Sequence, residues 1–355
     1  MNAASKAELL FERRGALALV TLNRPRTLNA LTLSMFRGLA VQVAAWAADP
    51  EVAAVVITGA GERAFCAGGD VIEVYDSARG DRKLAAELFR VEYRLNRDLF
   101  RYPKPTIALI DGIVMGGGVG ISLHGSHRVA TERTLFAMPE TAIGLFPDVG
   151  GSYFLPRLPG ALGLYLGLTG ARLQAADCLY AGIATHYVES ARLPALVDAL
   201  AAADWSGDAR AVASDAIAAF ASAPGDPPLA VQRAAIDRCF SKASVEAILA
   251  ALEAEEGAWA ESALAALRKC SPTSLKVTFR QLREGAGLDF EDAMIMEYRL
   301  SQACVAGHDF VEGIRAAVID KDRAPRWCPA SLDEVDEALV AAHFAPPEDG
   351  DLVFD

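Results

Sequence analysis

Short apolar runs separated by amphipathic stretches dominate the first half of the chain. The runs at 16–22, 52–58 and 106–110 contain almost no polar side chains, which is typical of strands buried in a parallel sheet. Between them, apolar residues at helical spacing predict helices at 34–48, 71–78 and 81–101. Because strand, crossover helix and next strand recur, the pattern predicts an α/β fold with parallel strands.

Two of these predicted helices carry finer detail. Ser34 is expected to cap the helix at 34–48 with its hydroxyl. In the helix at 81–101, the stripe expected to face the core consists of Leu84, Leu88, Val91, Leu95 and Leu99. Glu92 falls outside that stripe, so the pattern alone makes it an exposed charge on the helix surface.

Helices are also predicted at 159–168 and 175–181. Beyond about residue 190, alanine-rich helical periods replace this alternation. There, helices are predicted at 193–203, 208–221, 244–255, 258–269, 274–284, 290–306 and 311–318, with no regular structure from Pro346 onward. We therefore predict a core region, residues 1–190, which carries the functional site, and a helical region, residues 191–355. The helical region is expected to cover the core or to form a surface between copies of the chain.

Bulk composition narrows the functional class. The chain has 355 residues, of which 52% are hydrophobic, enough for one or two domains. A net charge of −12 argues against a general nucleic-acid binder. The mean hydropathy is +0.22, but no uncharged apolar run approaches the ~18 residues of a membrane span.

The six scattered cysteines form no CxxC pair and are expected to be free thiols. Residues 1–8 lack the features of a secretory signal or an arginine-rich presequence, so we expect a cytoplasmic protein.

Several common catalytic motifs are missing from the sequence. No Walker A loop, GxGxxG turn or GxSxG elbow occurs, which argues against a P-loop NTPase, a dinucleotide enzyme and an α/β serine hydrolase. His124 and His127 are three residues apart, and on a shared helix face they could hold a metal. Because no third ligand is apparent, we predict no metal site.

The stretch from Pro105 to Gly151 carries the candidate chemistry. The glycines at 116–118 bring bare backbone to the head of a predicted helix, where N–H groups suit an anion or a developing oxyanion. Glu140 and Asp148 follow in glycine- and proline-rich loops and could form an acid/base pair. Tight packing of the glycines, and solvated or capping carboxylates, are the structural alternatives.

Several motifs resemble the crotonase (enoyl-CoA hydratase/isomerase) superfamily. They are LNRP at 22–25, AFCAGGD at 64–70 and GGG at 116–118. FAMPETAIG at 136–144, FPDVGG at 146–151 and the segment 309–322 are similar to the branch that hydrolyses 3-hydroxyisobutyryl-CoA, a step of valine breakdown. The resemblance covers nearly the whole chain and implies a crotonase-like ββα spiral followed by helices.

The resemblance also implies roles for individual residues. The backbone N–H groups of Gly69 and Gly117 would form an oxyanion hole for a thioester carbonyl. Glu140 would act as nucleophile or general base, and Asp148 would orient or protonate a reacting group. Glu92 would hold the acyl hydroxyl. The substrate would also be bound by Ala67, Gly68, Asp70 and Gly116.

One position departs from the hydratases of the superfamily. They carry a glutamate three residues after the middle glycine of GGG, where this chain has Gly120. The departure favours a thioester hydrolase, with an enoyl-CoA hydratase or isomerase and a non-catalytic acyl-CoA-binding protein as alternatives. CoA arrives as part of the substrate, so no separate cofactor is expected. An acyl-CoA is the expected partner, alongside a homo-oligomer, and neither nucleic acid nor a membrane is expected.

Overall fold

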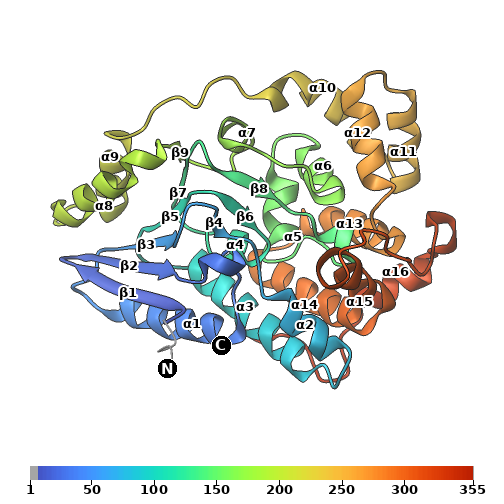
Figure 1. The fold of residues 1–355 in the computed structure, drawn as a ribbon, viewed down its shortest axis with the longest axis horizontal. Helices are drawn as coiled ribbons and strands as arrows, with labels where there is room; N and C mark the ends of the chain where they lie inside the picture. Colours follow the sequence, from blue (N-terminus) through green and yellow to red (C-terminus); the bar gives the residue numbers. More distant parts are fainter. Residues whose placement is uncertain (1–6, 355) are drawn as a thin grey trace. The chain divides into compact units, whose positions relative to one another are not determined.

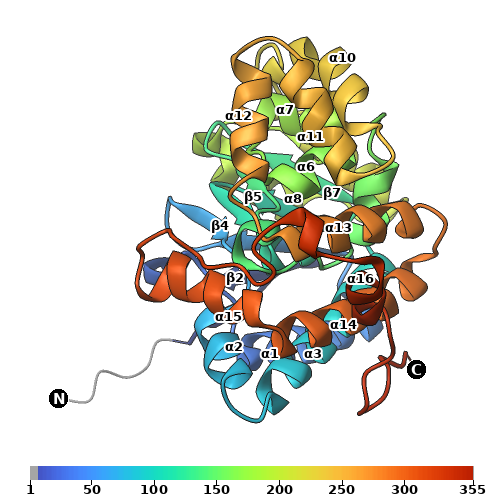
Figure 2. The same ribbon diagram turned by 90° about the vertical axis from the view of Figure 1, so that its right-hand side faces the viewer.

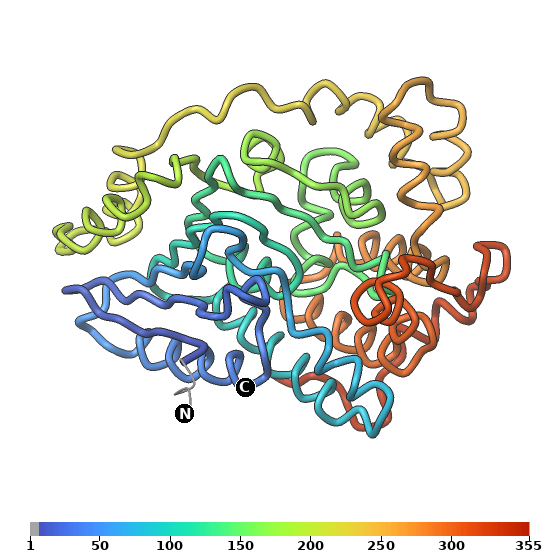
Figure 3. Tube along the Cα trace, viewed as in Figure 1, coloured from blue at the N-terminus to red at the C-terminus, as the bar shows by residue number. Residues whose placement is uncertain are grey.

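The computed structural model describes residues 7–354 and divides them into two compact units, each made of three separate stretches of chain. The first unit comprises residues 7–69, 95–136 and 173–227, and the second comprises 70–94, 137–172 and 228–354. The division predicted at residue 190 does not coincide with these boundaries and stays a prediction. Figure 3 traces the chain from end to end, including the extended yellow stretch between α9 and α10.

A six-stranded sheet forms the centre of the first unit (Figure 1). Its order is β1 (Leu9–Arg14), β2 (Leu17–Leu22), β3 (Ala54–Gly59), β5 (Thr106–Ile110), β7 (His127–Ala130) and β9 (His186–Tyr187). Only β1 runs antiparallel to its neighbour. The predicted α/β class with parallel strands is confirmed, and the apolar runs form the sheet because β2, β3 and β5 are buried on both faces.

Helices cover this sheet and a smaller sheet supports the loops at its end. Alternate residues of β2, β3 and β5 pack with α8 (Leu193–Ala202) and α9 (Ala209–Ala218) in one apolar cluster. The remaining helices of the unit are α1 (Leu33–Ala48), α4 (Gly117–Gly120) and α7 (Ala175–Ala181), and the smaller sheet has the order β4 (Ala64–Cys66), β6 (Ile113–Met115), β8 (Leu135–Ala137).

The second unit is helical, as the alanine-rich pattern predicts. Its helices are α2 (Val71–Ala78), the first part of α3 (Lys83–Phe100), α5 (Gly151–Phe154), α6 (Leu162–Thr169), α10 (Pro228–Phe240), α11 (Val245–Ala254), α12 (Ala258–Leu267), α13 (Pro272–Gly285), α14 (Phe290–Ala306), α15 (His308–Ile314) and α16 (Glu337–His343). Figure 2 shows α11 and α12 side by side, where an aromatic cluster of Tyr165, Phe240 and Trp259 joins α6, α10 and α12. Helix α14 packs against α5, α15 and α16.

Two details differ from the sequence-based expectations. The hydroxyl of Thr32, not Ser34, accepts the hydrogen bond from the Met35 N–H and caps α1. His127 lies in strand β7, so it shares no helix face with His124. Its ring nitrogens contact the hydroxyls of Ser126 and Ser214. All six cysteines are free thiols, as predicted, and none of the helices in the described part of the chain is long and apolar enough to cross a membrane.

Candidate active site

The glycine loops of the first unit lie against each other. Strand β6 leads into Gly116, whose φ of 46° starts the short helix α4. Gly68 has a φ of 120°, and a Cβ on it would lie 3.8 Å from the Gly117 nitrogen. A Cβ on Gly118 would overlap the Cys66 carbonyl oxygen, so the third glycine is required for packing. The packing interpretation of GGG is therefore confirmed, while the binding of an anion or a developing oxyanion by its N–H groups stays a prediction.

The loop around Gly68 is anchored by backbone hydrogen bonds. The N–H of Leu31 donates to the Gly68 carbonyl at 2.9 Å, and the N–H of Ala67 donates to the Leu28 carbonyl at 3.0 Å. Gly69 pairs with Leu31 in an isolated bridge. Asp70 follows as the N-cap residue of α2. The structure thus brings the backbone at 67–69 and the GGG backbone together in the first unit, while the binding of a thioester oxygen by Gly69 and Gly117 stays a prediction.

A cluster of buried carboxyl groups is the central feature of the second unit. It consists of Glu92 on α3, Glu140 after β8, Asp148 before α5 and Glu297 on α14, with exposed fractions of 3, 5, 4 and 0%. No salt bridge joins any of the four to a basic side chain among residues 7–354. Burying charge without a counter-ion is strongly unfavourable, so such a group holds protons or needs strong hydrogen-bond donors.

Hydrogen bonds divide the cluster into two pairs. The Tyr93 hydroxyl donates to Asp148 Oδ2 at 2.9 Å. The N–H groups of Gly150 and Ser152 donate to the two oxygens of Glu297, both at 2.8 Å. In contrast, Glu92 Oε1 and Glu140 Oε2 are buried without a hydrogen-bond partner. Unpaired buried acceptors are rare in proteins, so these two oxygens mark the part of the cluster suited to a ligand.

Burial shifts the titration of all four groups upward. Burial, followed by the charges of Asp148 and Glu297, raises the pKa of Glu92 well above its ordinary value. Burial and the Asp148 charge do the same to the pKa of Glu140. Burial raises the pKa of Asp148 to about 7, opposed by the Tyr93 hydrogen bond. Burial raises the pKa of Glu297 to about 8, although its two backbone donors oppose the shift. Shifts of this size mark candidate catalytic groups.

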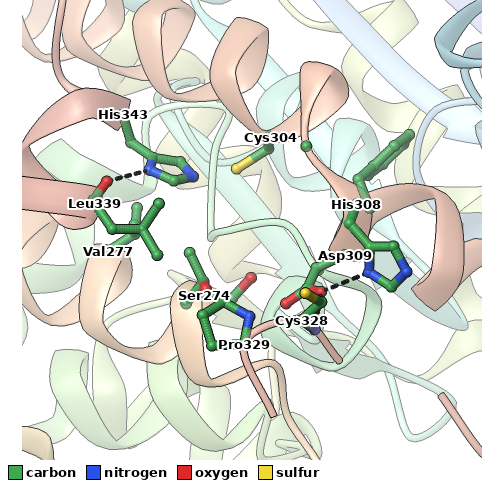
Figure 4. Close-up of a pocket in the computed structure, with 13 residues that line it drawn as sticks. Ser274, Val277, Cys304, His308, Asp309, Cys328, Pro329, Leu339 and His343 are labelled. Carbon is green, nitrogen blue, oxygen red and sulfur yellow. Dashed lines mark hydrogen bonds and ion pairs between the residues drawn. The ribbon is translucent and has the colours of Figure 1, made fainter. Parts of the chain in front are cut away.

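The structure therefore brings together three predicted site residues, Glu92, Glu140 and Asp148, and adds two that sequence reasoning missed. Tyr93 resembles an ordinary core residue of a helix, so no signal distinguishes it. Glu297 is different, because it directly follows the apolar run from Ala293 to Met296 in a helical segment, and a charge at a core position is such a signal. None of these five residues lines the separate cavity of the second unit shown in Figure 4.

Comparison with known proteins identifies the family. The family model described as enoyl-CoA hydratase/isomerase matches residues 17–344. The chain belongs to this family. It is 49% identical to the mitochondrial 3-hydroxyisobutyryl-CoA hydrolase of Danio rerio, across 99% of this chain and 93% of that protein. The corresponding protein of Homo sapiens is 48% identical across 98% of this chain and 91% of its own length. The resemblance stated from the motifs is confirmed.

Solved structures support the same fold. A carnitinyl-CoA dehydratase from Mycobacterium thermoresistibile has a TM-score of 0.91 and 44% identity, covering 97% of this chain and 98% of its own. An enoyl-CoA hydratase from Rhodobacter sphaeroides 2.4.1 has a TM-score of 0.90 and 39% identity, covering 98% and 100%. The predicted crotonase-like fold with a helical C-terminal region is confirmed.

The expected cytoplasmic location is wrong by this comparison. The curated hydrolases from Danio rerio, Gallus gallus and Homo sapiens are all named mitochondrial. The expectation rested on the composition of residues 1–8, most of which lie outside the described residues. A targeting segment is an address read by a receptor and is not a property of the folded core, so its apparent absence is poor evidence of location.

Proposed function

We propose that the protein hydrolyses (S)-3-hydroxyisobutyryl-CoA to CoA and 3-hydroxyisobutyrate. Water is consumed, the bond between the acyl carbon and sulfur breaks, and the thiol leaves with a proton. The observation that carries the proposal is the buried pair Glu140 and Asp148, in a chain nearly half identical to curated 3-hydroxyisobutyryl-CoA hydrolases over almost its full length.

The residues would divide the work as follows. The amides of Gly69 and Gly117 would stabilise negative charge on the thioester oxygen, and one such donor is typically worth ~3 kcal/mol in the transition state. Glu140 would attack the carbonyl through a mixed anhydride or activate water as a general base. Its unpaired Oε2 supports either route. Asp148 would orient or protonate the reacting groups, and Glu92 would accept a hydrogen bond from the hydroxyl of the acyl group.

Substrate binding would need no further cofactor, since CoA belongs to the substrate. The backbone around Ala67 and Gly68, with Asp70 and Gly116 beside it, would hold the CoA portion. A homo-oligomer stays a prediction.

An enoyl-CoA hydratase is the second candidate, favoured by the hydratase and dehydratase structures among the chain's structural neighbours. Gly120 argues against it, because the residue is buried in α4 and has no side chain to activate water. The deciding experiment offers the same preparation 3-hydroxyisobutyryl-CoA and crotonyl-CoA, following free thiol with a disulfide dye and the enoyl absorbance in parallel. We expect thiol release from the first compound and little loss of enoyl absorbance from the second. Rapid enoyl loss without thiol release would refute the hydrolase proposal.

The 3-hydroxypropionyl ester provides a control for substrate selectivity. It lacks one methyl group, which in an apolar pocket changes kcat/KM by only ~10–200-fold. Thiol should therefore be released from it as well, at a lower rate.

A further inference from the structure

Glu297 is a carboxylate buried in the middle of a helix whose inner face is apolar. Its neighbours Met294, Met296 and Leu300 are buried, and its own exposed fraction is 0%. The cost of burying its two oxygens is offset by the N–H groups of Gly150 and Ser152, each of which donates a hydrogen bond of 2.8 Å to one oxygen. These two hydrogen bonds hold the Glu297 side chain in one orientation and tie the start of α5 to α14.

The turn that Glu297 contacts is strained. Val149 has a φ of 52° and Gly150 a φ of 91°, so two consecutive residues adopt the left-handed region. For a β-branched residue such as Val149 this conformation is unfavourable and persists only where other contacts impose it. Gln281 on α13 holds the other side of the turn, because its Nε2 donates to the Pro147 carbonyl at 2.6 Å.

Asp148 lies between these two anchors. Its carbonyl accepts the Gly151 N–H at 2.8 Å, and its Oδ2 accepts the Tyr93 hydroxyl. The backbone direction at Asp148 is thus set by contacts to Pro147 on one side and to Gly150 and Ser152 on the other. We propose that Glu297 is a positioning residue for the reaction, which holds the turn after Asp148 and so fixes where the Asp148 carboxylate points. The inference rests on the proposed function.

Glu297 does not itself meet the substrate. Its side chain is completely buried and each oxygen already accepts a hydrogen bond, so it acts only through Asp148. A misplacement of about 1 Å in a catalytic group can cost ~10²-fold in rate. Loosening the turn should therefore lower kcat and leave KM for acyl-CoA nearly unchanged.

A double-mutant cycle separates positioning from general stability. Wild type, Glu297→Gln, Asp148→Asn and the double variant are compared by thiol release from 3-hydroxyisobutyryl-CoA. Glu297→Gln keeps the shape but turns one N–H acceptor into a donor. Relative to wild type, we expect Glu297→Gln to lower kcat ~10–100-fold and to change KM by less than ~3-fold. In the Asp148→Asn background, Glu297→Gln should lower kcat less than ~3-fold. Equal factors in both backgrounds, or an unchanged kcat, would overturn the proposal.

Asp309→Asn is the matched control. Asp309 is a buried carboxylate of the same unit that accepts the Cys328 N–H at 2.8 Å and the Ser271 hydroxyl at 2.6 Å, and it lines the cavity of Figure 4. Because it contacts no residue of the Asp148 turn, any effect on kcat should be the same factor in wild type and in Asp148→Asn. A control that behaves like Glu297→Gln would show that the cycle reports general loosening, which refutes a specific role.

The pH dependence gives a second measure. The charge of Glu297 acts on Glu92 and Tyr93 of α3 and on Glu140, and the charge of Asp148 acts on Glu297 and on the Cys304 thiol of α14. In this set, the Glu297 charge contributes to raising the pKa of Glu140. Glu297→Gln should shift the rise of kcat/KM with pH to lower pH. A merely structural role would leave the profile in place.

Amide hydrogen exchange tests the anchor independently of turnover. In wild type the N–H groups of Gly150 and Ser152 should exchange slowly, and in Glu297→Gln at least ~10-fold faster. Fast exchange at both positions in wild type refutes the proposal even if no variant folds. Glu297→Asp, one methylene too short to bridge both amides, replaces Glu297→Gln in the cycle if the latter is unfolded. A wild type that releases no thiol but shows the exchange pattern would refute the proposed function and leave the anchor standing.

Discussion

Asp148→Asn should remove a pH dependence from the stability of the fold. Asp148 is buried, and burial raises its pKa from an ordinary 3.8 to about 7, although the Tyr93 hydroxyl and backbone favour its charged form. Asparagine has nearly the same shape and can accept the same Tyr93 hydrogen bond, but it does not ionise. The substitution therefore isolates the free energy of ionising one buried carboxyl group.

The sign follows from proton linkage. Between about pH 4 and pH 7 the unfolded chain releases the Asp148 proton while the folded chain keeps it, so the free energy of unfolding falls as the pH rises. The difference of about three pH units, at ~1.36 kcal/mol per unit, amounts to about 4 kcal/mol, of which about 3 kcal/mol lies between pH 5 and pH 8. Wild type should lose this amount over that interval, and Asp148→Asn should not.

Urea unfolding at the two pH values, followed by tryptophan fluorescence, measures the effect. Comparing each protein with itself cancels any constant cost of the substitution. Asp226→Asn, an exposed change in the loop before α10, serves as control and should follow wild type. If the pH-dependent losses of wild type and Asp148→Asn differ by less than about 1 kcal/mol, the carboxyl is not held protonated by burial and the reasoning fails.

Two further predictions concern the chemistry and the glycine loops. Glu140→Gln should reduce thiol release by ~10²–10⁴-fold. Because burial raises the pKa of Glu140, wild-type kcat/KM should still be rising with pH above the range in which an ordinary glutamate titrates; a profile already level there would contradict this. Gly118→Ala should lower both acyl-CoA binding, measured by calorimetry, and turnover. The new Cβ would overlap the Cys66 carbonyl and separate the two glycine loops at a cost of ~1–3 kcal/mol; unchanged binding would contradict that packing.

The strands that the sequence predicts best are those buried on both faces. β3 and β5 lie within a residue or two of the apolar runs, because a continuous apolar run has no other stable place than the centre of a parallel sheet. The sequence pattern did not predict β1, since its residues LLFERR are mostly exposed at the sheet edge. Helices α10 and α16 were also missed, and the predicted helix at 311–318 is instead α15 followed by a π-helical turn at 315–319.

The inner face of α3 was predicted only in part, for a reason that concerns the site. Leu88, Leu95 and Leu99 are buried as predicted. However, Leu84 is exposed and Val91 is only half-buried, whereas Glu92 and Asn96 are buried. The inner face of the helix therefore carries polar groups, which a search for apolar periodicity assigns to solvent. Functional sites place polar groups at core positions, and these are the positions at which pattern-based prediction fails.

The sequence could identify Glu140 and Asp148 as acids but could not show how their pKa values shift. Those shifts depend on burial and on contacts between residues distant in the chain: Asp148 receives the Tyr93 hydroxyl from α3, and Glu297 receives amides from the turn at the start of α5. When Asp148 and Glu297 ionise, their charges favour proton retention on Glu92 and Glu140, each of which has a buried oxygen without a donor. The arrangement separates two carboxyl groups that accept hydrogen bonds from two whose buried oxygens have no donor. Glu140 must lose that proton before it can act as base or nucleophile, and a carboxylate that binds its proton tightly is the stronger base once ionised.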